Sequence, residues 1–253
     1  MAILEVKVCV KQFGGLVAVK DLSMSLNAGD LYGLIGPNGA GKTTVFNLIT
    51  GVYTPEEGTI ALEGKEIQGM KASAIAALGI SRTFQNIRLF QSMTVLENVK
   101  LARHVHRKQG LVDAIVRSSV MQTEESEIER DAIELLKIFH LDHLAQELAS
   151  NLPYGSQRRL EIARALATKP KLLLLDEPAA GMNPQESLEL MHLIRWLRDK
   201  FDLTILLVEH NMKVVMGVCE KIQVIDYGET IALGAPAEIQ DNPKVIEAYL
   251  GGA

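Results

Sequence analysis

A glycine-rich loop between an apolar run and a helix-compatible segment constrains this chain more than any other feature. The loop follows Leu31 to Ile35 and reads Gly36, Pro37, Asn38, Gly39, Ala40, Gly41, Lys42, Thr43 and Thr44. Glycines let the backbone aim successive N–H groups at phosphate oxygens, and a helix amino terminus adds partial positive charge. Strand, loop and helix in this order fit the P-loop pattern, so we predict that these nine residues bind a nucleotide.

Two side chains of the loop carry its chemistry. Lys42 places a full positive charge at the β- and γ-phosphates, and Thr43 offers a hydroxyl to Mg²⁺, which neutralises the phosphates. A chance glycine-rich turn is the alternative. The strand before the loop and the helix after it both argue against chance, so we expect bound ATP and Mg²⁺.

A second apolar run, Leu172 to Leu175, ends in the acidic pair Asp176 and Glu177. Ligands of parallel sheets gather at the carboxyl ends of the strands. We therefore predict that Asp176 holds the Mg²⁺ shell and that Glu177 accepts or orients the proton of an attacking water. An acidic pair after an apolar run is often an ordinary strand end, and the P-loop is what favours the chemical interpretation.

Two further residues are candidates for the same chemistry. His210 follows the apolar run Thr204 to Val208 and can donate a hydrogen bond toward the γ-phosphate or the water, although a structural histidine is the alternative. Gln85 can contact Mg²⁺ or the water, but a single glutamine carries almost no weight in isolation. We treat His210 and Gln85 as catalytic candidates, with Gln85 also a candidate metal ligand.

The apolar runs predict an α/β fold. The runs at 31–35, 172–175, 204–208 and 222–225 lack alternation, which indicates a sheet covered on both faces. Residues 4–10, 22–26 and 58–62 alternate more and predict an antiparallel β layer. Between Gln91 and Ala149 the strand signals vanish, and Ile128, Ala132, Leu135, Leu136 and Phe139 recur at helical spacing. We predict a mixed-sheet core from residues 1–90 and 160–253, with a helical subdomain at 91–159.

Composition limits the partners and the compartment. The net charge of −5 and the pI near 5.7 argue against a nucleic-acid surface, which needs clustered Lys and Arg. Two cysteines cannot build a disulfide framework or a four-ligand metal site. The N-terminus does not resemble a secretory signal and no apolar run approaches the roughly 20 residues of a membrane span, so we expect a cytoplasmic chain.

These elements in this order, together with the segment 152–159, resemble the ATP-binding-cassette (ABC) ATPases. The resemblance implies that two subunits sandwich two ATP molecules, each bound by one P-loop and the other subunit's signature helix. It also implies that Phe13 stacks on adenine, although core filling is the alternative for this ring. The residues it places at the partner's ATP are Leu152, Pro153, Tyr154, Gly155, Ser156, Gln157 and, in the D-loop, Asn183.

The chain departs from the family pattern at two places. Pro153 and Tyr154 stand where the family usually has Ser and Gly, so no hydroxyl from position 153 reaches the partner's γ-phosphate. We expect this to weaken the site built on the partner's P-loop. Asn183 stands where the D-loop usually carries Asp, which leaves an uncharged amide at the subunit boundary and puts communication between the two sites in doubt.

Within the family, the segments 82–86, 152–164 and 242–251 resemble branched-chain amino-acid importers of the LivG type. The last of these predicts a short helix in which Val245, Ile246, Tyr249 and Leu250 form one stripe that docks on the subunit. The resemblance implies a second ATPase subunit, identical or different, a transmembrane permease, indirectly a solute-binding protein, and a position on the inner face of the cell membrane.

Other functions remain open at this point. Urea or amide import and lipopolysaccharide export use much of the same pattern with different membrane partners. A soluble nucleotide switch or kinase, a cassette protein acting on DNA or ribosomes, and a binding-only module are the remaining alternatives. The switch or kinase lacks its expected motif, and the DNA or ribosome protein lacks a tandem cassette or a basic surface. The binding-only module is opposed by the presence of Lys42, Asp176, Glu177 and His210.

Overall fold

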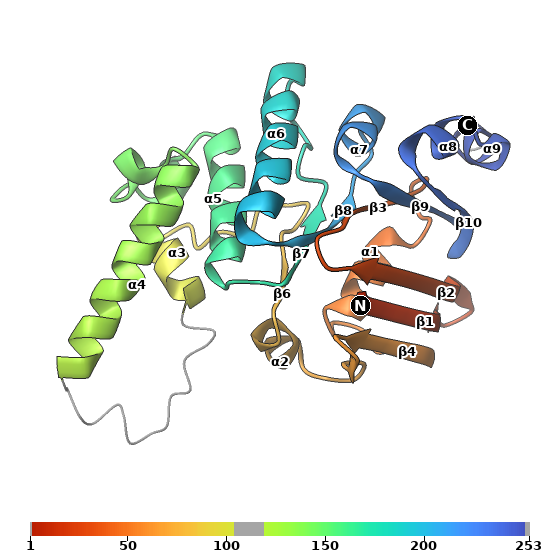
Figure 1. Ribbon diagram of the computed structural model, residues 1–253, viewed down its shortest axis with the longest axis horizontal. Helices are drawn as coiled ribbons and strands as arrows, with labels where there is room; N and C mark the ends of the chain where they lie inside the picture. Colours follow the sequence, from red (N-terminus) through yellow and green to blue (C-terminus); the bar gives the residue numbers. More distant parts are fainter. Residues whose placement is uncertain (1, 104–118, 251–253) are drawn as a thin grey trace. The chain divides into compact units, whose positions relative to one another are not determined.

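The computed structural model describes residues 2–103 and 119–250. The chain divides into two compact units (Figure 1). One contains the residues up to Gln85 and from Lys171 onward, and the other runs from Asn86 to Pro170. The predicted boundaries at 91 and 159 differ from these, because a single helix, α5 (Tyr154–Ala167), spans position 159 and cannot be divided there.

The first unit is built on a six-stranded sheet in the order β10-β9-β3-β8-β7-β6. Its strands are β3 (Leu31–Ile35), β6 (Ile80–Arg82), β7 (Leu172–Asp176), β8 (Thr204–Val208), β9 (Lys221–Asp226) and β10 (Glu229–Gly234). All neighbours pair in parallel except β10, which is antiparallel to β9. Every residue of β3, β7 and β8 is buried, as are residues 222–225 of β9, which confirms the four strands predicted from runs without alternation.

A second sheet in this unit is antiparallel, as predicted. Its order is β2-β1-β4-β5, with strands β1 (Ala2–Phe13), β2 (Leu16–Asn27), β4 (Glu57–Leu62) and β5 (Lys65–Glu66). Helix α1 (Lys42–Ile49) shares one hydrophobic core with both sheets, through Val45, Phe46 and Ile49. This core fixes the strand before the glycine-rich loop and the helix after it, and so holds the two ends of the loop.

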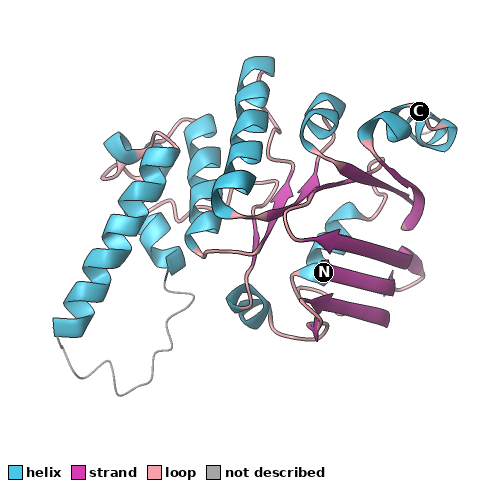
Figure 2. Ribbon diagram, in the orientation of Figure 1, coloured by secondary structure: helices cyan, strands magenta, loops and turns pink. Residues whose placement is uncertain are grey.

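The opposite face of the six-stranded sheet is covered by helices (Figure 2). Leu173, Ile205 and Leu207 are buried but lie outside the core shared with α1, as expected from the two-residue period of a strand. Helix α2 (Ala72–Ala77) contributes Ile75 to the core shared with α1. The remaining helices of this unit are α6 (Pro184–Phe201), α7 (Met212–Val218), α8 (Pro236–Gln240) and α9 (Pro243–Leu250). The sheet is therefore covered on both faces.

The second unit is helical. It contains α3 (Val95–Arg103), α4 (Ser119–Ile138) and α5, with short 3₁₀ turns at Asp142–Leu144 and Ala149–Asn151. The predicted stripe is buried at Ala132, Leu135, Leu136 and Phe139, and half-buried at Ile128. Residues 104–118 of the predicted helical segment lie outside the described residues.

The C-terminal helix α9 differs from its prediction. Val245 is buried, but Ile246 is 45% exposed and Tyr249 37% exposed, so the predicted stripe does not dock as a whole. The side chain of Leu250 lies outside the described part of the structure. Burial raises the pKa of the Tyr249 phenol, and a hydrogen bond with the Gly36 backbone opposes that rise. The amphipathic spacing was correct, but the phenol, which has a polar end, lies toward the loop backbone instead of in the core. Within the described residues, no helix combines the length and the apolar character that a membrane span needs.

Candidate active site

Parallel pairing brings the ends of four strands to the same edge of the six-stranded sheet. β3 leads into the glycine-rich loop, β6 precedes Gln85, β7 ends at Asp176, and β8 is followed two residues later by His210. The pairing of Asp176 with Val208, and of Leu34 with Val208, sets these ends level with one another. The predicted residues Lys42, Gln85, Asp176, Glu177 and His210 therefore belong to one edge of one sheet.

The loop after β3 follows a path that only glycine permits at two points. A Cβ at Gly36 would lie 2.0 Å from the carbonyl oxygen of Ile225, and one at Gly41 would lie 2.4 Å from that of Ala18. Gly41 also has a φ of 104° and precedes the first residue of α1. The backbone thus wraps closely enough to present its N–H groups together with the amino terminus of α1, which is the arrangement that binds phosphate.

Lys42 is folded onto this loop. Its Nζ donates to the carbonyl oxygens of Gly36, at 2.7 Å, and Pro37, at 2.8 Å, and the residue is only 7% exposed. Burial lowers the pKa of this amine, and the charges of Glu177 and Asp176 oppose the shift. A phosphate at the loop would give this buried cation an anionic partner in addition to the carboxylates of Glu177 and Asp176. The loop therefore favours a bound polyphosphate.

The carboxylate of Glu177 is contacted by both of the other catalytic candidates. Its Oε2 accepts a hydrogen bond from Nε2 of Gln85 at 2.7 Å, and its Oε1 lies 2.7 Å from Nε2 of His210. Glu177 has a φ of 46°, and its backbone N–H donates to the carbonyl of Val208. A non-glycine residue in this left-handed conformation must be held there by the surrounding structure, here in part by the hydrogen bond to Val208.

Asp176 is paired with an arginine that sequence reasoning did not assign. Arg82 Nη2 lies 2.7 Å from Oδ2 of Asp176, and both side chains are less than 8% exposed. Arg82 also donates through Nη1 to Oδ1 of Asn47 on α1, and its guanidinium lies 5.2 Å from the Phe46 ring centroid. In the sequence, Arg82 appears only as part of the motif around Gln85. Its pairing with Asp176 joins residues far apart in the chain and has no local sequence signal.

The oxygen donors at this edge suit Mg²⁺. Thr43 lies in the first turn of α1 with its side chain exposed, and Asp176 supplies carboxylate oxygens at the end of β7. The described residues contain no group of three or more acidic, His or Cys side chains that would hold a metal by themselves. Mg²⁺ commonly takes one or two protein oxygens together with phosphate oxygens and water, and Thr43 and Asp176 provide such protein oxygens.

Phe13 lies at the end of β1 and is not a core residue. Its side chain is 42% exposed, its ring meets Tyr53 edge-on at 5.1 Å between centroids, and Nζ of Lys11 lies 5.3 Å from its centroid. The core-filling alternative for Phe13 is therefore wrong. A ring with this exposure has surface available for stacking, as adenine binding requires.

The predicted signature segment lies in the helical unit, at the start of α5. Leu152 is buried, whereas Pro153 and Tyr154 are exposed. Pro153 is the N-cap of α5 and supplies no capping side chain, while Nε2 of Gln157 donates to the carbonyl of Leu152. The start of α5 is exposed to solvent, but Pro153 and Tyr154 replace the Ser and Gly of the family pattern. Gly155 and Ser156 follow in the first turn and are half-buried.

Asn183, the predicted D-loop residue, has a structural role in the first unit. Its Oδ1 accepts from the N–H of Glu186, and its own N–H donates to the Glu186 carboxylate, which forms a capping box for α6. The side chain is exposed. Asn183 therefore caps the start of α6, and this role does not depend on a contact with a second subunit.

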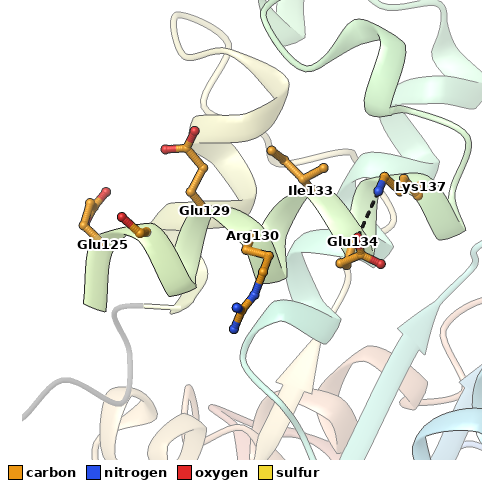
Figure 3. A pocket seen from close by; sticks show the side chains of 7 residues that line it. Glu125, Glu129, Arg130, Ile133, Glu134 and Lys137 are labelled. Atoms are coloured by element: carbon orange, nitrogen blue, oxygen red, sulfur yellow. Dashed lines mark hydrogen bonds and ion pairs between the residues drawn. The ribbon is translucent and has the colours of Figure 1, made fainter. Parts of the chain in front are cut away.

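A hollow on the surface of α4 contains none of the predicted site residues. It is lined by charged side chains, among them Glu129, Arg130, Glu134 and Lys137, with Ile133 between them (Figure 3). The dashed line in Figure 3 marks the contact between Lys137 and Glu134, one turn apart. Such pairs are ordinary for an exposed helix face.

Two family models match the chain. The model described as ABC transporter matches residues 19–180. A second, described as branched-chain amino acid ATP-binding cassette transporter, matches residues 229–253.

Curated relatives align over nearly the whole chain. LivG of Salmonella typhimurium, a high-affinity branched-chain amino acid transport ATP-binding protein, is 49% identical over 99% of this chain and 98% of its own length. BraF of Pseudomonas aeruginosa, named in the same way, is 46% identical with the same coverage. LptB of Escherichia coli, a lipopolysaccharide export system ATP-binding protein, is 36% identical, again over 99% and 98%.

Solved structures agree with the fold. The ADP conformation of an ATP-binding cassette of an ABC transporter superimposes with a TM-score of 0.85 at 34% identity, covering 99% of both chains. A dimeric cassette in a post-hydrolysis state, bound to ADP and Pi, gives a TM-score of 0.78 at 25% identity over 92% of this chain and 98% of that one. With its P-loop, acidic strand end and full-length similarity, this chain belongs to the ABC transporter ATP-binding family, in the group that contains LivG and BraF.

Proposed function

We propose that this chain is the ATP-hydrolysing subunit of an importer for branched-chain amino acids. The observation that carries the proposal is the carboxylate of Glu177 at the carboxyl end of β7, within hydrogen-bond reach of Gln85 and His210. Lys42 on the P-loop belongs to the same sheet edge. A phosphate cradle beside a carboxylate base provides for hydrolysis as well as for binding.

The residues divide the reaction among them. The loop N–H groups and Lys42 bind the phosphates, and the exposed Phe13 ring stacks on the adenine. Glu177 takes or orients the proton of the attacking water, and His210 donates a hydrogen bond toward the γ-phosphate. Thr43, Asp176 and Gln85 would hold Mg²⁺ from the protein side, and the ion would neutralise phosphate charge.

We further propose that the chain works in a pair, as one of two cassettes that enclose two ATP molecules. The dimeric cassette structure at 25% identity supports pairing, and the exposed start of α5 provides the surface for the partner's nucleotide. Pro153 and Tyr154 at that start would make the partner's site the weaker one. A transmembrane permease, and through it a solute-binding protein, would complete the transporter on the inner face of the membrane.

The substrate class rests on similarity, since a transported solute need not touch this subunit. LivG and BraF at 49% and 46% identity support branched-chain amino acids, as does the match of residues 229–253 to the corresponding C-terminal model. LptB, at 36%, supports lipopolysaccharide export less well.

The test is to purify the chain with its membrane partners, reconstitute the complex in vesicles, and measure ATP turnover with and without leucine and its binding protein. Solute-stimulated turnover is expected, and urea or a lipopolysaccharide should not replace leucine. Lys42→Ala should lose ATP binding, whereas Glu177→Gln should bind ATP and not hydrolyse it. Undiminished turnover in Lys42→Ala would refute the proposed site.

A further inference from the structure

Glu209, the residue between β8 and His210, is a buried carboxylate that the mechanism above does not use. It is 3% exposed, and no ion pair found among the described residues includes it. Burial raises its pKa, three backbone hydrogen bonds oppose the rise, and the negative charge of Glu177 adds to it. A carboxyl group in such a place is costly unless its hydrogen bonds compensate for the lost water.

The hydrogen bonds of Glu209 come from two separate loops. Its Oε1 accepts from the N–H of Ala179 at 2.7 Å. Its Oε2 accepts from the N–H of His210 at 3.0 Å and from that of Asn211 at 3.1 Å. One oxygen is therefore committed to the segment that follows Glu177, and the other to the segment that carries the catalytic imidazole.

This arrangement fixes the distance between the two segments. Ala179 is two residues after Glu177, whose own N–H donates to the carbonyl of Val208, the last residue of β8. Two hydrogen bonds thus connect the residues after β7 to the end of β8. One runs from the Glu177 N–H to the Val208 carbonyl, and the other from the Ala179 N–H to the Glu209 carboxylate. The 2.7 Å contact between Glu177 Oε1 and His210 Nε2 lies just beyond these two connections.

Resting on the function proposed above, we propose that Glu209 is a positioning residue that holds His210 in place against Glu177 and couples it to the Ala179–Asn183 segment. Both oxygens are required, because one amide or hydroxyl cannot accept from both loops. Movement of residues 179–183 then displaces the imidazole through Glu209. A loosely held imidazole lowers the rate of the chemical step and leaves the phosphate cradle intact.

Glu209→Gln is the informative substitution, because it keeps the volume and one oxygen but places an NH₂ group opposite a backbone N–H. The matched control is Gln223→Leu. Gln223 is equally buried on β9 and makes three hydrogen bonds, with Tyr32, Ser23 and Thr230, none of which involves a site residue. Both variants remove buried polar contacts, and only one removes contacts to the catalytic loops.

The experiment measures kcat and KM for Mg·ATP in the reconstituted complex, together with the melting temperature of each variant. Glu209→Gln is expected to lower kcat about 10-fold or more, with KM changed less than about twofold. Gln223→Leu is expected to lower the melting temperature and to leave kcat within about twofold. In a His210→Ala background, Glu209→Gln should lower the remaining rate less than about twofold, because the residue it positions is gone.

An unchanged kcat in Glu209→Gln would overturn the positioning role, and so would an equal loss with and without His210. A kcat that follows the melting temperature in both Glu209→Gln and Gln223→Leu would show a purely structural residue and overturn it too. An inactive wild-type complex would instead refute the proposed function, so the two failures are distinguishable.

Discussion

Replacing Arg82 by Met should destabilise the nucleotide-free chain strongly. The substitution keeps an unbranched apolar side chain but removes the cation that faces Asp176 at 2.7 Å, in a pair whose side chains are 7% and 6% exposed. Removing one member of a buried pair leaves an uncompensated charge and costs about 3 to 5 kcal/mol. The bond to Asn47 and the approach to the Phe46 ring are lost as well, which places the expectation in the upper half of that range.

The assay is urea unfolding followed by circular dichroism. For a chain of this size we take an m-value of about 3 kcal/mol/M, so the loss corresponds to a midpoint lowered by about 1 to 2 M. The matched control is Arg198→Met, which removes the same side chain from a pair with Glu220 that is 22% and 58% exposed. Because exposed pairs contribute about 0 to 1 kcal/mol, its midpoint should move by less than about 0.3 M.

A double-mutant cycle separates the pair from general packing. Arg82→Met combined with Asp176→Leu leaves no buried charge at the pair, so the double variant should lose at least about 2 kcal/mol less than the sum of the single losses. Additivity within about 0.5 kcal/mol, or a shift in Arg82→Met no larger than in Arg198→Met, would refute the argument that Arg82 compensates the charge of Asp176.

Four further outcomes are expected. Pro153→Ser should raise ATP turnover of the intact pair, because it restores a hydroxyl toward the partner's phosphate, and should stabilise α5 by about 1 kcal/mol as an N-cap; an unchanged or lower turnover would count against this. Asn183→Ala should cost about 1 kcal/mol in urea unfolding, while Asn183→Asp keeps the capping box of α6 and should cost almost nothing. Phe13→Ala should raise KM for ATP with little change in the melting temperature, and Phe13→Tyr should restore it, since the ring is exposed; a large loss of stability would contradict the stacking role. Burial raises the pKa of Cys9 to about 11 and of Cys219 to about 12, so neither thiol should react with an aromatic disulfide reagent at pH 8 until urea unfolds the chain; rapid reaction of the folded protein would be inconsistent with this burial.

The sequence predicted the sheets well because burial of a strand on one or both faces produces a recognisable pattern of apolar residues. The buried runs at 31–35 and 204–208 became strands with identical bounds. Helix α9 shows where the pattern stops being sufficient. The apolar spacing of Ile246 and Tyr249 predicted docking, yet both side chains stay more than one third exposed. A helical stripe specifies a face, but whether a surface exists to receive it depends on tertiary structure.

The site was predicted in proportion to how local its signals are. The loop around Lys42 has a contiguous motif with a strand before it and a helix after it, and the structure has both. Arg82 and Glu209 have no such motif, because their roles come from contacts 94 and 30 residues away in the sequence. A lone charged residue beside a strand is commonplace, and only its burial and its partners distinguish it.

The contacts of Glu177 bear on how hydrolysis begins. Both carboxylate oxygens are engaged, one by Gln85 and one by His210, at 2.7 Å each. These are the same side chains that the proposed mechanism directs toward Mg²⁺ or water and toward the γ-phosphate, so the two sets of contacts compete. In that mechanism, the hydrogen bonds that Gln85 and His210 make to Glu177 are exchanged for contacts with the bound nucleotide, so the net cost stays far below that of breaking them. In the proposed mechanism, the γ-phosphate shares the His210 imidazole with Glu177, and the carboxylate keeps acceptor positions for the attacking water, while Glu209 holds the His210 backbone in place.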